Sequence, residues 1–117
     1  MRLALAFGGL NGLCAVALGA YAAHGIPDPH AADLVRQASS YQLFHAVLLV
    51  GIGVCAERRP SRLLGIAAFF VVVGTLLFAG ALYASGLFGL TFGPVAPIGG
   101  ISLMLGWFTL FLAAFGR

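Results

Sequence analysis

The side chains that could do chemistry in this sequence are few, and the densest group of them lies near the middle of the chain. Tyr41, Gln42 and His45 are spaced so that a helix would place all three on one face. His24 is a second histidine set among small and apolar residues. Two facing histidines could hold a metal ion, a haem or a quinone, whereas phenol and amide groups could hold a polar headgroup.

The number of available ligands argues against a metal. Zinc takes three or four Cys, His or carboxylate ligands, and His24 and His45 would have to be completed from residues 28–33. Bis-histidine haem needs two histidines at matched depth, and His24 lies nearer to the surface by residue count. We therefore expect no metal and no cofactor. The preferred interpretation is a polar packing network that includes Asn11 and Tyr83, and the alternative is a small-molecule or lipid-headgroup site.

The composition defines the surroundings of these residues. Of 117 residues, 62% are apolar and 8% are charged, whereas about 25% are charged in an average soluble chain. The chain has six basic residues, three acidic residues and two cysteines. These numbers exclude a water-soluble globule, a disordered or collagen-like chain, a nucleic-acid-binding protein and a disulfide scaffold, and they favour a membrane protein.

Stretches without charge predict four membrane spans. The charged residues leave uninterrupted stretches at 3–27, 37–56 and 63–116, and a membrane helix requires about 20 predominantly apolar residues. The third stretch is long enough for two spans, and the prolines and glycines of residues 85–97 mark the connection between them. The predicted spans are approximately 3–23, 36–56, 63–84 and 98–116, within a single membrane domain of residues 1–117.

The arginines predict the orientation of these spans. Four spans place both termini and the middle connection on one side of the membrane, and that side carries all but one of the six arginines. Connections rich in arginine remain in the cytoplasm, so we predict that both termini are cytoplasmic. The arginines on that side are Arg2, Arg58, Arg59, Arg62 and Arg117, and the remaining one is Arg36.

The N-terminal segment has two possible interpretations, and the two cysteines raise the question of a disulfide. Arg2, an apolar run and the small-residue triplet 20–22 also match the pattern of a secretory signal peptide, and we expect an uncleaved span instead. Cys14 would lie near mid-membrane and Cys55 near the cytoplasmic face, so we expect no disulfide between them.

Small residues predict how the helices pack. Helices in lipid associate through close backbone contact and interhelical hydrogen bonds, so we predict an all-α, compact four-helix bundle. Asp28 followed by Pro29 is typical of an N-cap and first helical position, which would start the second helix ahead of its span. Trp107 falls at mid-span and is expected to fill the bundle or a partner surface. The glycines expected at helix contacts are Gly8, Gly12, Gly19, Gly74, Gly99 and Gly106.

Four short motifs follow one another along the chain. They are Gly19-Ala20 with Ala23-His24-Gly25, Tyr41-Gln42-Leu43-Phe44-His45-Ala46, Leu77-Phe78-Ala79-Gly80-Ala81-Leu82-Tyr83, and Pro97-Ile98-Gly99-Gly100 leading to Gly106-Trp107. Together they resemble the small membrane-protein family called domain of unknown function 423, over essentially the whole chain. The resemblance implies a four-span protein of the bacterial inner membrane without an established activity, and it supplies no catalytic residue.

The sequence favours a protein that is not an enzyme. It lacks a serine with a plausible base, a pair of intramembrane carboxylates and the charged residues that an ion path requires inside the spans. We predict a multi-pass accessory, scaffold or assembly protein that contacts the lipid bilayer and a larger membrane complex or a second copy, and that binds no nucleic acid. The alternative is a module that binds or transports a lipid, quinone or other small molecule in the outer half of the bundle, through His24, Tyr41, Gln42, His45, Tyr83 and Asn11.

Overall fold

Four helices account for most of residues 2–116, which are the residues that this computed structural model describes. Helix α1 spans Arg2–His24, α2 spans Pro29–Arg58, α3 spans Arg62–Phe88 and α4 spans Val95–Ala113. Each is long and apolar enough to cross a membrane. The predicted all-α fold with four candidate spans is therefore confirmed. Arg117, which contributed to the predicted orientation, lies outside the described residues, as does Met1.

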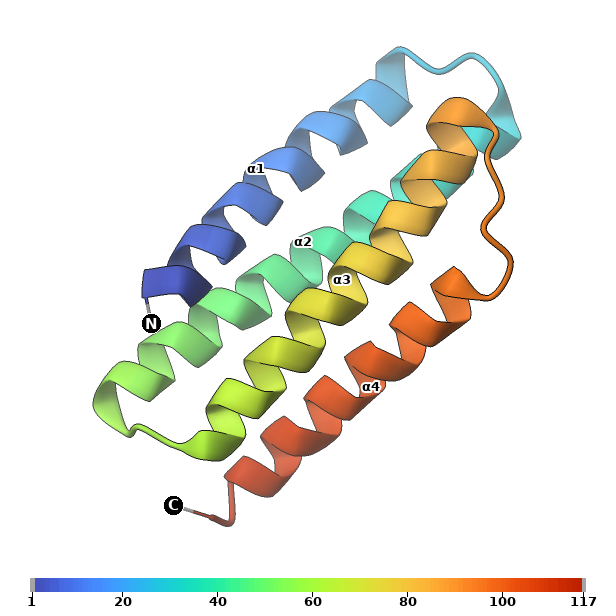
Figure 1. Cartoon of the computed structure of the whole chain (residues 1–117). Coiled ribbons are helices and arrows are strands. Elements are labelled where there is room, and N and C mark those ends of the chain that lie inside the picture. The colour runs from blue at the N-terminus through green and yellow to red at the C-terminus, as the bar shows by residue number, and fades with distance from the viewer. Residues whose placement is uncertain (1, 117) are drawn as a thin grey trace.

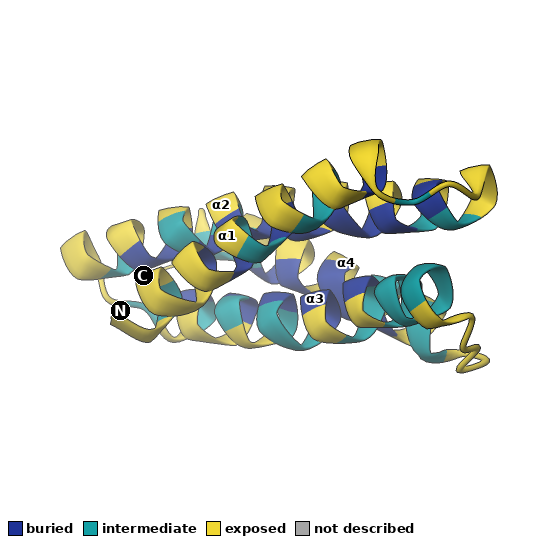
Figure 2. Cartoon of the chain, turned by 90° about the horizontal axis from the view of Figure 1, so that it is seen from above, coloured by how far each residue is buried: buried dark blue, intermediate teal, exposed yellow. Residues whose placement is uncertain are grey.

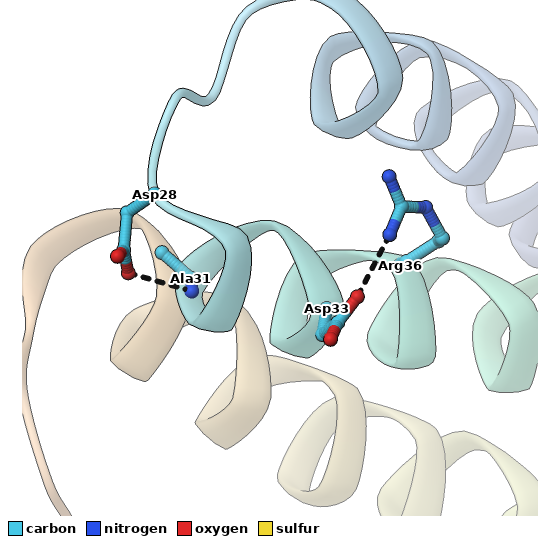
Figure 3. A network of polar contacts seen from close by, with 4 residues as sticks. All are labelled: Asp28, Ala31, Asp33 and Arg36. Carbon is cyan, nitrogen blue, oxygen red and sulfur yellow. Dashed lines mark hydrogen bonds and ion pairs between the residues drawn. The ribbon is translucent and has the colours of Figure 1, made fainter.

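The start of α2 follows the predicted capping pattern. Asp28 is the N-cap residue, and its side chain accepts a hydrogen bond from the backbone nitrogen of Ala31 at 2.9 Å. This bond satisfies one of the N–H groups that a helix start leaves without a helical partner. One turn later, Arg36 and Asp33 form an exposed ion pair at 2.8 Å (Figure 3). Helix α2 therefore begins seven residues before its predicted span at residue 36.

Helix α3 continues into the segment that was predicted to be a connection. It reaches Phe88 and ends at Gly89, which adopts a left-handed conformation with φ of 70°. Gly86 lies inside the helix and is packed on α2, because an added Cβ would lie 2.7 Å from Cγ2 of Val35. The prediction that Gly86 breaks the helix was therefore wrong, since its missing side chain permits a close helix contact.

Helix α4 begins earlier than predicted. It starts at Val95, so Pro97 lies in its first turn. A proline is tolerated there because the first N–H groups of a helix have no partner within the helix. The connection between α3 and α4 is correspondingly shorter than the predicted 85–97.

The helices lie antiparallel and side by side in chain order (Figure 1). Helix α1 packs on α2, α2 on α3 and α3 on α4, whereas the other pairs within residues 2–116 make at most marginal contact. The molecule measures 49 × 26 × 17 Å. The predicted bundle is thus present, but its packing is sequential and leaves α1 and α4 without a mutual interface. The start of α1, the end of α4 and the α2–α3 connection lie at the same end of the molecule (Figure 1).

Helix α2 forms the centre of the packing. It buries ten residues along its length, against four in α1. Val35, Leu49 and Val71 are the largest side chains that are fully buried. Buried positions face the neighbouring helices, and the outer sides of the ribbons are exposed (Figure 2). In a membrane these exposed sides face lipid, so the apolar outer surface agrees with the predicted environment.

The glycines expected at helix contacts lie between helices and differ in how closely they pack. A Cβ added at Gly8 would lie 2.9 Å from the carbonyl oxygen of Ala46, and one added at Gly12 would lie at an ordinary 3.9 Å from a side chain. An added Cβ would also lie too close to a neighbouring residue at four other glycines. These are Gly19 near Ser39, Gly74 near Leu103, Gly99 near the backbone of Phe78 and Gly106 near Val71.

Candidate functional site

Gln42 links α2 to both of its neighbours. Its amide nitrogen Nε2 donates a hydrogen bond to Oδ1 of Asn11 on α1 at 2.8 Å. Its amide oxygen Oε1 accepts a hydrogen bond from the hydroxyl of Tyr83 on α3 at 2.6 Å. One side chain of α2 therefore holds two helices, with partners 31 and 41 residues away in the sequence.

The backbone carbonyl of Phe7 determines which atom donates and which accepts in each hydrogen bond from Asn11 through Gln42 to Tyr83. The carbonyl of Phe7 can only accept, so the amide nitrogen of Asn11 faces it, at 2.8 Å. This leaves Oδ1 of Asn11 as the acceptor for Gln42, and Oε1 of Gln42 as the acceptor for Tyr83. Asn11 and Gln42 are 7% and 9% exposed. Each nitrogen and oxygen atom of these buried amides thus has a hydrogen-bond partner within the chain.

His45 forms a second polar group on the same helix. Its Nδ1 lies 2.7 Å from the carbonyl oxygen of Tyr41, one turn earlier. Its Nε2 lies 3.1 Å from Nε1 of Trp107 on α4. A carbonyl only accepts and an indole N–H only donates, so the proton of the imidazole is on Nδ1 and Nε2 is the acceptor. His45 is therefore a neutral imidazole with both nitrogens in use.

Aromatic rings surround His45. The Tyr41 and His45 rings are stacked at a centroid distance of 6.2 Å, and Trp107 meets the imidazole edge-on at 5.9 Å. The Tyr41 ring also packs against Phe78 of α3 at 4.6 Å. Tyr41 is nevertheless 43% exposed. The prediction that it points into the bundle together with Gln42 is thus only partly matched, since its ring lies at the rim.

The geometry of His45 opposes a metal or haem function. A metal bound at Nε2 would have to replace the hydrogen bond from Trp107, and Nδ1 carries the proton that the Tyr41 carbonyl accepts. Within residues 2–116, no three His, Cys, Asp or Glu residues lie close enough together to hold a metal ion. His24, at the last position of α1, is exposed and belongs to neither polar group.

Comparison with known proteins gives the family of this chain. The family model "Protein of unknown function (DUF423)" matches residues 18–100. The chain belongs to this family. A UPF0382 membrane protein of Staphylococcus aureus is 33% identical, over 98% of this chain and 97% of its own length. The UPF0382 inner membrane protein YgdD of Escherichia coli is 33% identical, over 97% of this chain and 89% of its own length.

The relatives extend to eukaryotes. A UPF0382 membrane protein of Schizosaccharomyces pombe is 32% identical, over 86% of this chain and 92% of its own length. No solved structure matches the chain. With four candidate spans and relatives named as inner membrane proteins, this DUF423 protein is a multi-pass integral protein of the bacterial inner membrane, of uncharacterised activity.

Sequence reasoning missed two residues that complete the site of this DUF423 protein. Trp107 was predicted to be packing, and it donates to His45. A tryptophan N–H at mid-membrane requires an acceptor, and this requirement was the available signal. Ser39 donates to the carbonyl of Ala15 at 2.7 Å, and its place one turn before Gln42 indicated the same face. Within residues 2–116, the hydroxyl of Thr75 is the buried side-chain polar atom without a partner.

Proposed function

We propose that this DUF423 protein is a non-enzymatic accessory or assembly protein that packs against another membrane protein. One observation carries the proposal: the buried polar side chains of the candidate site already have hydrogen-bond partners within the chain. Gln42 is occupied by Asn11 and Tyr83, and His45 is occupied by Trp107 and a backbone carbonyl.

A closed network of this kind suits a structural role. An acid, a base or a ligand-binding group must present a free donor or acceptor to a substrate, and each polar atom of the buried amides and of the imidazole here already has a partner. Polar groups in a membrane interior are costly when they lack partners, whereas satisfied interhelical bonds fix which helix faces meet. The polar residues therefore specify the fold, and the functional surface lies on the outside of the bundle.

Glycines on the outer surface support a packing role. A Cβ added at Gly9, Gly51, Gly65 or Gly80 would have no neighbouring atom within 4 Å. These glycines are in helices yet make no close contact within the chain, and glycine lowers helix stability by about 0.5–1 kcal/mol relative to alanine. In membrane helices, small residues allow the backbones of two helices to approach each other. A second membrane protein, or a second copy, would use that access.

The test is purification of the tagged protein in mild detergent, followed by identification of the molecules that co-elute. We expect a protein partner, or a second copy, in fixed stoichiometry. Gly80→Leu should release that partner while the melting temperature of the protein is retained. A monomer that brings no protein partner, and that is unaffected by bulky residues at the outer glycines, would contradict the proposal.

A second candidate function is binding of a small molecule in the outer half of the bundle. Tyr41 favours it, because its ring packs on His45 and Phe78 while the side chain is 43% exposed. The phenol hydroxyl is thus presented at the rim, next to aromatic surface that could stack on a quinone. Under this alternative, a co-purifying small molecule would be lost from Tyr41→Phe without a change in melting temperature. Retention of the molecule by this variant would reject the alternative.

A further inference from the structure

A cavity lies at the end of the molecule where α2 ends and α3 begins. It has a volume of about 1200 Å³ and is bounded by α2, α3 and α4. Its lining combines apolar side chains of the three helices, which we call the walls, with two arginines and the α2–α3 connection, which we call the rim. The lining includes Val54, Leu64 and Leu110 on the walls and Arg58, Arg59 and Ser61 on the rim. An apolar volume with two guanidinium groups at one edge matches an amphiphile with an anionic headgroup.

The two rim arginines have no acidic partner within residues 2–116. The ion pair in that part of the chain joins Arg36 and Asp33 near the start of α2, whereas Arg58 is the last residue of the same helix. Glu57 precedes Arg58 in the sequence but does not line the cavity. Both arginines are exposed, so their charges are available to an anion. Guanidinium groups bind phosphate through paired N–H donors, which gives direction as well as charge.

The start of α3 adds to the positive potential at the rim. Ser61 is the N-cap of α3 and accepts a hydrogen bond from Leu63 N at 3.2 Å. The first N–H groups of a helix carry a partial positive charge. Arginines and a helix start thus act on the same edge of the cavity, and within the described residues neither arginine forms an ion pair with a carboxylate.

We propose that this cavity binds one anionic phospholipid, with the headgroup phosphate at Arg58 and Arg59 and the upper part of an acyl chain along the apolar wall. A membrane lipid is favoured over a free ion, because the walls are apolar and the volume exceeds that of a phosphate. Basic pockets between membrane helices bind anionic headgroups in the cytoplasmic leaflet, and this is the end predicted to be cytoplasmic. The proposal is independent of the outer-half site and of a protein partner.

Native mass spectrometry of the purified protein in neutral detergent tests the site. Phosphatidylglycerol and phosphatidylcholine with the same acyl chains are added separately and in competition. We expect one tightly bound phosphatidylglycerol and a clear preference over phosphatidylcholine. The Arg58→Gln/Arg59→Gln double variant should bind phosphatidylglycerol roughly tenfold more weakly, because each arginine near a headgroup contributes to anionic lipid binding.

Two matched variants separate the cavity from general surface charge. Arg62→Gln removes one charge from the same end but does not alter a lining residue, so it should retain the preference for phosphatidylglycerol. Ala114→Phe places a ring at the cavity lining without changing charge, and it should weaken binding. Melting temperatures establish that each variant is folded.

Three results would overturn the proposal. The first is an equal loss of binding in Arg62→Gln and in either single variant, Arg58→Gln or Arg59→Gln, which would indicate unspecific attraction to charge. The second is full lipid binding both by Ala114→Phe and by the separate double variant Arg58→Gln/Arg59→Gln, which would show that the cavity is not the binding site. The third is displacement of phosphatidylglycerol by equimolar inorganic phosphate, which would indicate an ion site without a contribution from the acyl chain.

Discussion

The indole nitrogen of Trp107 donates a hydrogen bond to Nε2 of His45 over 3.1 Å, which joins α4 to α2 although α4 packs mainly on α3. The bond requires that Nε2 carry no proton. Because Nδ1 faces the carbonyl of Tyr41, the imidazole meets both requirements in a single neutral tautomer. One side chain of α2 thus contributes directly to the position of α4.

Removal of the indole donor should loosen this contact. Trp107→Phe keeps an aromatic ring but leaves Nε2 of His45 without a partner, in a residue that is 5% exposed. We expect a loss of about 1 kcal/mol in unfolding free energy, in the range of single interhelical hydrogen bonds in membranes. The measurement is reversible unfolding in detergent.

Phe108→Leu is the matched control for this prediction. Phe108 is the next residue on α4 and is 56% exposed, so its truncation should leave stability nearly unchanged. A double-mutant cycle between Trp107→Phe and His45→Phe measures the coupling directly. Strictly additive losses in that cycle would show that the bond does not contribute.

Gln42 should be more sensitive than either of its partners. Gln42→Leu removes two interhelical bonds and leaves Oδ1 of Asn11 buried without a donor. We expect destabilisation of about 1–3 kcal/mol, since an unsatisfied buried group loses its full solvation. Tyr83→Phe removes one of the two bonds and should cost less.

The double variant Asn11→Leu/Gln42→Leu distinguishes a missing bond from a missing shape. Replacing both partners by apolar groups removes the unsatisfied acceptor, so the double variant should be more stable than Gln42→Leu alone. Equal or lower stability of the double variant would mean that packing, and not hydrogen bonding, determines the contribution of Gln42.

Two glycines provide a matched test of helix contact. A Cβ at Gly99 would collide with the backbone nitrogen of Phe78, whereas one at Gly80 would meet no atom within 4 Å. Gly99→Ala should therefore lower the unfolding free energy by about 1–3 kcal/mol through overpacking. Gly80→Ala should raise it by up to about 1 kcal/mol through helix propensity. Thermal unfolding in the same detergent compares the two, and a stable Gly99→Ala variant would refute the close α3–α4 contact.

The orientation of the protein can be measured with single cysteines. In a background with Cys14→Ala and Cys55→Ala, Pro60→Cys lies in the α2–α3 connection and Thr91→Cys in the α3–α4 connection. We expect an impermeant thiol reagent to label Thr91→Cys in intact spheroplasts, and Pro60→Cys only in inverted vesicles. This expectation follows from the arginines beside Pro60. The reverse labelling pattern would refute the predicted cytoplasmic termini.

Much of the fold could be predicted because the length of a membrane span, the charges that flank it and the residues that cap a helix can be read from short stretches of the sequence. A run without charge predicts a span, and Asp28 with Pro29 predicts the start of α2 to the residue. One exception lies at residues 85–88, where Ser85 and Gly86 suggested a break. Gly86 in fact permits close contact with Val35, and a single sequence does not distinguish a glycine that ends a helix from one that packs.

The candidate site could be predicted as a face but not as a set of partners. Helical periodicity places Tyr41, Gln42 and His45 together, yet it does not identify the residues that they meet on other helices. Those partners depend on the relative height and rotation of separate helices. Trp107 was thus assigned to packing, while His24 was included although it is exposed at the end of α1.

The neighbour-by-neighbour packing of the four helices has a consequence for biogenesis. Each helix after the first packs on the one synthesised immediately before it, so assembly can proceed in the order of translation without waiting for a distant segment. Contacts between neighbouring segments close short loops and form quickly. The last helix to leave the ribosome carries Trp107, whose bond to His45 forms only after α2 and α3 are in place. A chain that ends before α4 therefore leaves Nε2 of His45 without its hydrogen-bond donor, and only the complete chain satisfies it.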